Sequence, residues 1–512
     1  MNDWLGNVIA AFSPEAAYRR ESYRQAYLEL KSYYDAADRT GVNQNWRAMN
    51  TSAEYTDRYS RDDVRARARD LERNSDIMNS VVGPFRRNVV GGGYQVQAKT
   101  KDPELNKEIE KAWRKWCKKR NCDVTGTQSF NQIMRMAVER KKIDGGILFV
   151  KRYTSEGFVP FQLQMIEVDE LDLTIMQARN ADNKVVGGIE YNSFNKPVGY
   201  YIRQYDIDGF TQRDPVYVEA KDVIFYFTKK RPSQLREISD MSHTIQRVRD
   251  VNEFMTAVSV KERIAACLAV FIKKAIPTSG MGGVGRSNNA GKQPEHIVSY
   301  EGKTISPGMI KEMNAGDEVQ VVNPSGQGSD ATSYTKLQQR LIGAGQGISY
   351  EASSRDMAES TYSSTRQSLI EDNLTYQEDK EQIIEIHDEI YETFIISAVL
   401  CGKLDIKDFW NNKDEYLDHE WVQEPKAWID PQKESNATMT ALQTGQKTFK
   451  QIAAENGRDW RSQIDDMAEV IQYGQEKGID MGGILFGKKT EDRKSTRLNS
   501  SHTDSSRMPS SA

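Results

Sequence analysis

The sequence predicts an α+β protein that is predominantly helical. From residue 14 to residue 120, charged segments carry apolar residues every three or four positions, which is the spacing of amphipathic helices. Between about 144 and 228 the pattern changes to short aliphatic and aromatic runs bounded by turn residues, which is typical of β-strands. A long amphipathic helix is predicted near 369–395. With 512 residues and 38% hydrophobic content, the chain can hold two or three packed units whose surfaces are polar or shared with neighbours.

The N-terminal region is expected to be mostly helical and the next region rich in strands. Trp113 and Trp116 recur at helical steps on one predicted face. Helical spacing with dense charge occupies 14–37, 61–90 and 103–120. Strands are predicted at 147–150, 161–166, 188–191, 200–202 and 223–227, with Asn, Asp, Gly and Pro in the turns between them.

The second half alternates between long helices and irregular segments. A helix over 245–267 presents an apolar face made by Val248, Val251, Phe254, Met255 and Val258. Strand-like runs at 269–272, 296–299 and 318–322 flank a glycine-rich segment at 279–291. The order then predicted is a helix over 333–347, a polar loop over 351–362 and a long helix to about 401.

Short capped helices followed by a tail are predicted for the C-terminal region. The helix start signals are Asp430 with Pro431 and Thr448 with Gln451, and the stop signals are Gly457 and Gly478. From Lys488 onward the chain is rich in Ser, Arg and Thr without any periodicity, so we expect disorder there. The string at 495–502 also resembles translated sequencing-adapter read-through, and no function is assigned to it.

Composition argues against several classes of protein. The 70 basic and 74 acidic residues give a net charge of −4, so the chain lacks the positive field of a protein that grips phosphates for affinity. Its cysteines, Cys117, Cys122, Cys267 and Cys401, are too few for a disulfide framework and show no CxxC pairing, so free thiols are expected. Neither a cleavable leader nor an apolar window of about eighteen residues is found, so neither export nor a membrane span is predicted.

Two glycine-rich motifs resemble nucleotide-binding loops only superficially. Gly280-x-Gly282-x-x-Gly285 matches a dinucleotide fingerprint as a string, but residues 286–291 are a poor start for a helix, so a flexible loop is favoured. The segment 285–292 has one residue too many for a Walker loop, and Gln293 stands where Ser or Thr would bind magnesium. No NTP site is predicted.

Histidines and basic clusters are better explained by surface or pairing roles than by chemistry. The five histidines lack metal-ligand spacing, and His387 and His419, which have carboxylate neighbours, are expected on solvated helix surfaces or subunit contacts. The basic residues of 115–120 alternate with tryptophan, which favours a solvated helix face. Arg65, Arg67 and Arg69 spread around a helix and have acidic residues close by in sequence, so intersubunit or structural pairing is expected in place of DNA binding.

The segment from Ile348 to Arg366, ISYEASSRDMAESTYSSTR, is a polar loop between helical patterns and contains nothing that could do chemistry. It resembles the tunnel loop of tailed-phage portal proteins of the lambda-type family. Two residues depart from the family pattern: Glu237 stands where Gly is usual and Ser353 where Leu is usual. Other family-like signatures occur in order: Tyr34-Asp35-Ala36-Ala37 with Trp46, Val64 to Asn74, Asn88 to Gly93, Arg231 to Arg236, and Trp428 to Glu434.

The resemblance implies a portal fold with wing, stem, clip and crown, assembling into a ring of about twelve subunits at one capsid vertex. The implied order is an N-terminal arm and wing over 1–235, a stem helix over 236–266, a clip over 267–332, a second stem helix over 333–350, a tunnel loop over 351–362, a long wing helix over 363–402, a crown over 403–487 and a disordered tail over 488–512. The genome would be packaged through this ring by terminase and later ejected. A near-neutral lining would suit the passage of DNA better than a basic one.

The resemblance also implies where the protein acts and what it meets. It would be a virion protein assembled in the host cytoplasm, with its own copies, double-stranded DNA in transit, terminase, major capsid or scaffold protein and head-completion proteins as partners. No membrane, cofactor, metal or catalytic residue is expected. The residues expected to face DNA are Ser353, Ser354, Arg355, Asp356, Ser360 and Thr361.

Two other classes of function compete with this interpretation. The first is a nucleic-acid-processing enzyme or packaging motor subunit of a phage, but the sequence offers neither a phosphate loop ending in Lys-Ser/Thr nor an acidic cluster with metal spacing. The second is a monomeric scaffold or adaptor protein, which a measurement of native mass would distinguish from a ring.

Overall fold

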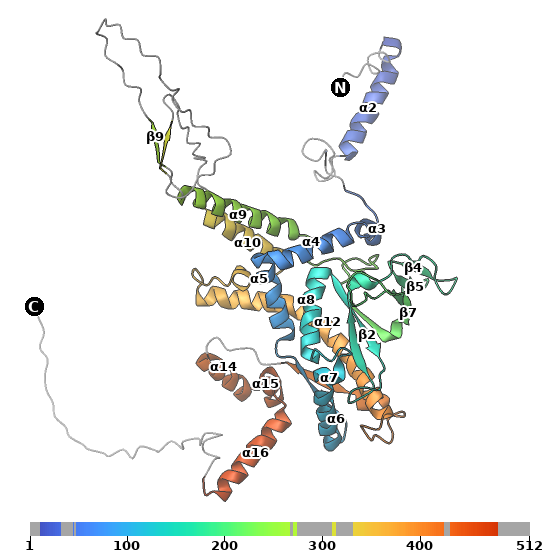
Figure 1. Ribbon diagram of the computed structural model, residues 1–512, viewed down its shortest axis with the longest axis vertical. Coiled ribbons are helices and arrows are strands. Elements are labelled where there is room, and N and C mark those ends of the chain that lie inside the picture. The colour runs from blue at the N-terminus through green and yellow to red at the C-terminus, as the bar shows by residue number, and fades with distance from the viewer. Residues whose placement is uncertain are drawn as a thin grey trace, which may run out of the picture. The chain divides into compact units, whose positions relative to one another are not determined.

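The computed structural model describes residues 11–31, 45, 48–266, 270–273, 310–313, 331–423 and 431–479 (Figure 1). The predicted segments 279–291, 296–299 and 318–322, together with Asp430, Cys267 and the tail, lie outside these residues. The chain divides into two units, one comprising Met1–Ser60 with Lys230–Leu235 and the other Arg61–Lys229 with Arg236–Ala512.

The smaller unit contains two helices. Helix α2 (Pro14–Lys31) falls within the predicted helix over 14–37. Helix α3 (Ala53–Asp57) begins after Ser52, whose hydroxyl accepts a hydrogen bond from the Tyr55 amide. The Ala53 amide donates to Ser233 Oγ at 2.9 Å, so the segment Lys230–Leu235 fixes the start of α3.

The N-terminal part of the larger unit is helical, as predicted. Helix α8, which the sequence patterns did not reveal, begins at a capping box in which Ser129 and Gln132 satisfy each other's backbone amides. The helices of this part are α4 (Arg61–Asn74), α5 (Asp76–Phe85), the π-helix η3 (Arg86–Val90), α6 (Pro103–Trp116), α7 (Lys119–Cys122) and α8 (Phe130–Asp144).

Two antiparallel sheets confirm the strand-rich region. The first has the order β3-β2-β8, and its central strand β2 is buried, which explains its continuous apolar sequence. The second has the order β4-β5-β6-β7. Their strands are β2 (Gly146–Arg152), β3 (Gln162–Ile166), β8 (Val223–Phe227), β4 (Lys184–Val186), β5 (Ile189–Tyr191), β6 (Pro197–Ile202) and β7 (Val216–Glu219). The short 3₁₀ helix η4 (Val168–Glu170) follows β3, and η5 (Ala220–Asp222) joins β7 to β8.

Two further strand pairs join distant parts of the chain. Strand β1 (Tyr94–Ala98) pairs antiparallel with β11 (His419–Gln423), and β9 (Val270–Lys273) pairs parallel with β10 (Ile310–Met313). Among these four strands, only β9 was predicted. The other three were missed because strands this short carry little periodicity and their partners lie far away in sequence.

Long helices dominate the second half of the larger unit. The predicted helices over 245–267, 333–347 and up to about 401 are confirmed as α9 (Ile245–Ala266), α10 (Ala331–Gly345) and α12 (Tyr362–Leu400). The capping box of Thr448 and Gln451 is also confirmed, and Gly457 and Gly478 have positive φ after their helices. The remaining helices are α11 (Tyr350–Ser354), α13 (Lys413–Leu417), α14 (Pro431–Gln443), α15 (Phe449–Glu455) and α16 (Trp460–Glu476).

The core of the larger unit lies among α5, α6, α8, β2 and α12, and Figure 1 shows α8 lying beside β2. Trp113 and Trp116 stack at 5.0 Å, and Trp116 stacks on Phe161 at 5.3 Å. The Trp116 indole N–H donates to the Phe161 carbonyl, so its one polar group is satisfied. The predicted amphipathic helix is therefore confirmed at these two tryptophans.

His387 corrects the expectation of a solvated histidine. It is 1% exposed and lies among the rings of Tyr94, Phe130 and Trp421. Its Nδ1 is 2.7 Å from the Ile383 carbonyl one turn earlier in α12. Burial lowers the pKa of His387 to about 4, so the ring is neutral at physiological pH and behaves as a core residue.

Arg65 and Arg69 of α4 are paired, as predicted, whereas no ion pair of Arg67 is found among the described residues, and the pairing of Arg65 explains the unusual Glu237. Arg65 contacts Asp169 at 2.8 Å and Glu237 at 3.1 Å, while Arg236 also binds the Glu237 carboxylate at 2.7 Å. Burial alone would raise the pKa of Glu237, but the charges of Arg236, Arg61 and Arg65 lower it. A carboxylate at this position therefore compensates buried guanidinium groups.

Within the described part of the chain, none of the helices combines the length and the apolar character that crossing a membrane would require. Cys117, Cys122 and Cys401 are free thiols, in agreement with the prediction.

Candidate functional site

Two helices from distant parts of the sequence lie side by side and lead into the predicted loop. Helices α9 and α10 pack through the rings of Phe254 and Tyr334, whose centroids are 4.5 Å apart (Figure 1). Arg247 donates to Gln338 at 2.8 Å along the same contact. This pair occupies the place in the chain order where a two-helix stem was expected.

The predicted packing face of α9 is only partly buried. Val248 and Val251 are fully buried, where α4 and α10 both pack against α9. Phe254 and Val258 are half-buried, and Met255 is 43% exposed. That all five residues pack in the stem therefore stays a prediction, and within one chain Met255 keeps an exposed surface although Thr335 of α10 contacts its sulfur.

A tight turn joins α10 to α11. Gly347 has φ of 71°, and a Cβ at this position would meet Thr375 Oγ1 at 2.9 Å, so glycine is required by both conformation and space. The Gln346 side chain donates to the Asp240 carbonyl at 3.2 Å, and His243 Nε2 is 2.6 Å from the Gly345 carbonyl. These contacts fix the direction in which the chain leaves α10.

The predicted loop over 351–362 begins later than expected, because 350–354 form helix α11. Ser349 caps this helix, and its amide and hydroxyl donate to Asp372 of α12 at 2.6 and 2.7 Å. Ser353 is 3% exposed, and the hydroxyls of Ser353 and Ser354 both donate to the Tyr350 carbonyl. Neither serine is thus free in a loop, and the irregular segment is 355–361.

The acidic groups of this segment are held against α10. Lys336 of α10 donates to Glu359 at 2.8 Å, which raises the pKa of Lys336 and lowers that of Glu359. Asp356 accepts from the Ala358 amide and from the Tyr350 hydroxyl, and these bonds lower its pKa. Ser360 donates to the Met357 carbonyl, and Thr361 caps α12.

Arg355 differs from the other residues of the segment. It ends α11 in the left-handed conformation, with φ of 59°, and its side chain is exposed. No ion pair joins it to Asp356, although the two are adjacent in sequence, since Asp356 faces Tyr350 and Lys336. Its charge instead acts on Arg87, whose pKa is lowered first by burial and then by Arg355.

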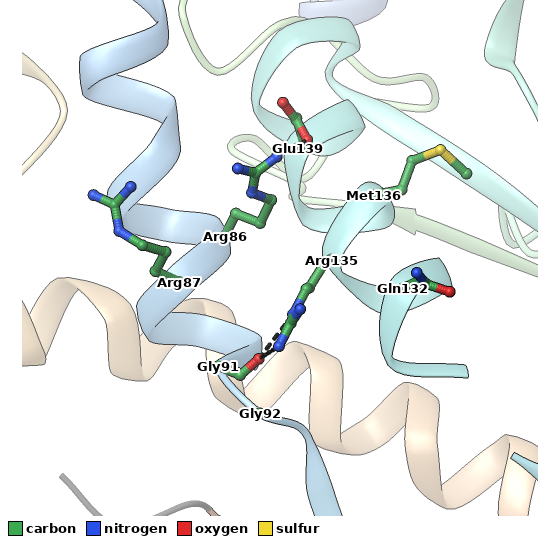
Figure 2. Close-up of a pocket in the computed structure, with 8 residues that line it drawn as sticks. All are labelled: Arg86, Arg87, Gly91, Gly92, Gln132, Arg135, Met136 and Glu139. Carbon is green, nitrogen blue, oxygen red and sulfur yellow. Dashed lines mark hydrogen bonds and ion pairs between the residues drawn. The ribbon is translucent and has the colours of Figure 1, made fainter. Parts of the chain in front are cut away.

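Arg87 belongs to a groove of about 600 Å³ between the π-helix η3 and α8, here called the arginine groove. Figure 2 shows Arg135 reaching the Gly91 carbonyl, whereas Arg87 points away from α8. Arg86 pairs with Glu139 at 3.2 Å. The lining residues are Arg86, Arg87, Gly91, Gly92, Gln132, Arg135, Met136 and Glu139.

Sequence reasoning missed this groove, because its residues come from two separate segments. The only local signal is the pair Arg86-Arg87 just before the glycines of 91–93, and a lone basic pair is a weak signal. The loop was found because its polar run is continuous.

Comparisons with known proteins agree with the arrangement. The sequence pattern of the family described as "Phage portal protein, lambda family" matches residues 39–380. A "Probable portal protein" of Halomonas phage phiHAP-1 is 24% identical over 465 residues, covering 88% of each chain. "Portal protein B" of Escherichia phage lambda is 17% identical, covering 77% of this chain and 81% of its own length. The "Portal protein" of Escherichia phage N15 is 18% identical, covering 82% and 86%.

The family match spans more than half of the chain and includes α9, α10, α11 and the loop at 355–361. The chain therefore belongs to the lambda family of phage portal proteins, structural components of the virion that act in DNA packaging and in joining head to tail.

Proposed function

We propose that copies of this chain form a closed ring of about twelve subunits through which double-stranded DNA passes. The observation that carries this proposal is the partly uncovered α9–α10 pair. Leu337, Leu341 and Met255 are 53%, 44% and 43% exposed in one chain. Apolar side chains gathered on a packed helix pair are stabilised when a neighbouring subunit covers them.

In this ring the segment 355–361 faces the DNA. Its carboxylates are held on α10 by Lys336, and Arg355 is its one cation. A single exposed arginine per subunit contacts a phosphate backbone weakly, so DNA can slide past the loop. The DNA-facing groups are then Arg355, Asp356, Ser360 and Thr361, whereas Ser353 and Ser354 support the loop from α11.

The other regions take the roles that the family order suggests. Helices α9 and α10 are the stem, and residues 267–332 are the clip, which meets terminase and later the head-completion proteins. Residues 363–402 are the long wing helix, and 403–487 are the crown, on the side of the capsid or scaffold protein. Within the residues that the structure describes, α12 fits the wing helix because it links the loop to the core.

The test is the assembly state of the purified full-length chain. Native mass spectrometry and electron microscopy should show rings of many subunits at micromolar concentration. ATPase and nuclease assays with magnesium should give no activity above that of a mock purification. A monodisperse monomer, or nuclease activity that persists through further purification, would contradict the proposal.

A further inference from the structure

Helix α12 carries an exposed stripe of five residues on the side away from the core. Successive residues of an α-helix are about 100° apart, so spacings of four, four, three and four keep the five within roughly 80°. All are exposed, and the first two are apolar. The stripe consists of Ile370, Leu374, Glu378, Glu381 and Glu385.

The acidic half of this stripe lacks cations. Some other carboxylates of α12 are paired with cations, since Glu389 lies 2.7 Å from Lys151 and Asp379 forms a buried ion pair with Lys141. Among the described residues, no Lys, Arg or His forms an ion pair with Glu378, Glu381 or Glu385. Carboxylates one turn apart repel each other, so a cationic surface brought against them would be stabilising.

The arginine groove has the complementary excess of charge. Arg86 is paired with Glu139, but in the described residues neither Arg87 nor Arg355 forms an ion pair with a carboxylate. The two positive charges also act on each other. Arg87 therefore lines the groove without a carboxylate partner, and Arg355, which lies outside the lining, adds a second positive charge that acts on it, while the stripe presents carboxylates that lack cations.

The two surfaces face in different directions. Asp379 of α12 and Lys141 of α8 point toward each other across the core. By helix geometry the stripe lies about 100–180° around α12 from Asp379, and Arg135 and Glu139 of the groove lie about 120–160° around α8 from Lys141. Complementary patches on opposite sides of one subunit permit head-to-tail contacts, which can close into a ring.

We propose that the stripe on α12 of one copy docks in the arginine groove of the next copy. This inference rests on the ring proposed above and names the surfaces that meet in it. A second copy is favoured over DNA as the occupant, because Arg135 is committed to the Gly91 carbonyl and Arg86 to Glu139. The exposed Ile370 and Leu374 beside the carboxylates also require an apolar cover, which a phosphate backbone does not provide.

Charge reversal and rescue test the docking. Arg87→Glu alone and the double change Glu381→Arg/Glu385→Arg should each raise the concentration of half-assembly about tenfold, as seen by native mass spectrometry. The chain that carries all three changes should recover most of that loss, because the reversed charges again attract. The matched control is Glu108→Arg/Glu469→Arg, which makes the same change in net charge at exposed positions off the stripe and should leave assembly unchanged.

Each other outcome is decisive. If wild-type rings form and every reversal leaves them intact, the docking is wrong and the ring stands. If Arg87→Glu leaves the rings intact but weakens their binding to double-stranded DNA, the groove is a DNA contact and the inference is overturned. If the wild-type chain stays monomeric, the proposed ring fails and the docking fails with it.

Discussion

His387 shows how a single residue can make the stability of the fold depend on pH. The folded protein holds this histidine neutral in an aromatic environment, with its pKa lowered by burial from the ordinary 6.5 to about 4. Between these two values the unfolded chain binds a proton that the folded chain excludes. The contribution to stability is therefore complete above pH 6.5 and is lost as the pH falls through 4.

Because the pKa of His387 is lower in the folded chain than in the unfolded chain, the protein should lose stability in mild acid. On lowering the pH from about 7.5 to about 5, the free energy of unfolding should fall by about 2 kcal/mol from this residue alone. His387→Gln should flatten that difference in urea unfolding, while the wild type should show it in full. An equal pH dependence in His387→Gln and wild type would show that His387 is not the responsible group.

Arg355 is the residue at which a contact with DNA can be separated from folding. Its side chain is exposed and joins no ion pair among the described residues, so Arg355→Ala should leave the thermal midpoint and ring formation unchanged. DNA packaging or retention should change, because the loop loses its only cation. The measurements are native mass, thermal unfolding and an in vitro packaging assay, with Lys447→Ala as an exposed control outside the loop. Loss of rings in Arg355→Ala would place this residue at a subunit contact instead.

The sequence predicts the environment of a residue where that environment depends on neighbours a few positions away. The cap of Thr448, the ion pair of Arg65 with Asp62 and the shared helix face of Trp113 and Trp116 follow from neighbours within a few positions. His387 and Ser353 could not be placed, because burial depends on which distant segments cover a residue. The ion pair of Asp356 with Lys336 likewise joins the loop to helix α10, twenty positions earlier in the chain, so no local pattern indicates it.

At the scale of elements, α9 changes its surroundings along its length. It packs against α4 and α10, and its early residues Val248 and Val251 are buried, whereas Met255 one turn later is exposed. The same apolar pattern therefore forms part of the core at Val248 and Val251 and part of the subunit surface at Met255. Periodicity identifies the helix and its face but does not say which chain covers that face.

Two aspartate substitutions in α9 should distinguish the residues that stabilise the fold from those that contact a neighbouring subunit in the proposed ring. Val251→Asp places a charge at a fully buried site and should cost more than about 3 kcal/mol of unfolding free energy, as measured by urea denaturation. Met255→Asp, one turn later and 43% exposed, should leave the unfolding free energy within about 0.5 kcal/mol of wild type but reduce ring formation. Rings of normal stability in Met255→Asp would mean that no neighbour covers this part of the stem.

Long helices and pairs of short strands differ in how well the sequence predicts them. Helices α9, α10 and α12 were anticipated because each is long and periodic over many turns. The pairing of β1 with β11 was not, because five-residue strands more than three hundred residues apart share no local pattern. That pairing matters for the fold, because it brings His419 and Trp421 beside α12, where both contact Asp388.

At the scale of the whole molecule, nearly balanced charge conceals a separation of charge. The net charge is −4, yet among the described residues Arg87 lines the groove without a carboxylate partner, and Glu378, Glu381 and Glu385 lie along α12 without cations. In the proposed docking, such a chain attracts its own copies without strong attraction for nucleic acid. That combination suits a subunit that must assemble tightly and still allow DNA to move.

Salt should therefore act on assembly with a sign that depends on the charges at the interface. In wild type, raising the salt to about 1 M shortens the screening length to about 3 Å and should raise the concentration of half-assembly several-fold, measured by analytical ultracentrifugation. In Glu381→Arg/Glu385→Arg the facing charges repel, so the same salt should lower that concentration. Opposite salt responses in the two proteins require like charges to meet in the variant. Parallel responses would show that the contact between subunits is apolar, with the stripe and the groove outside it.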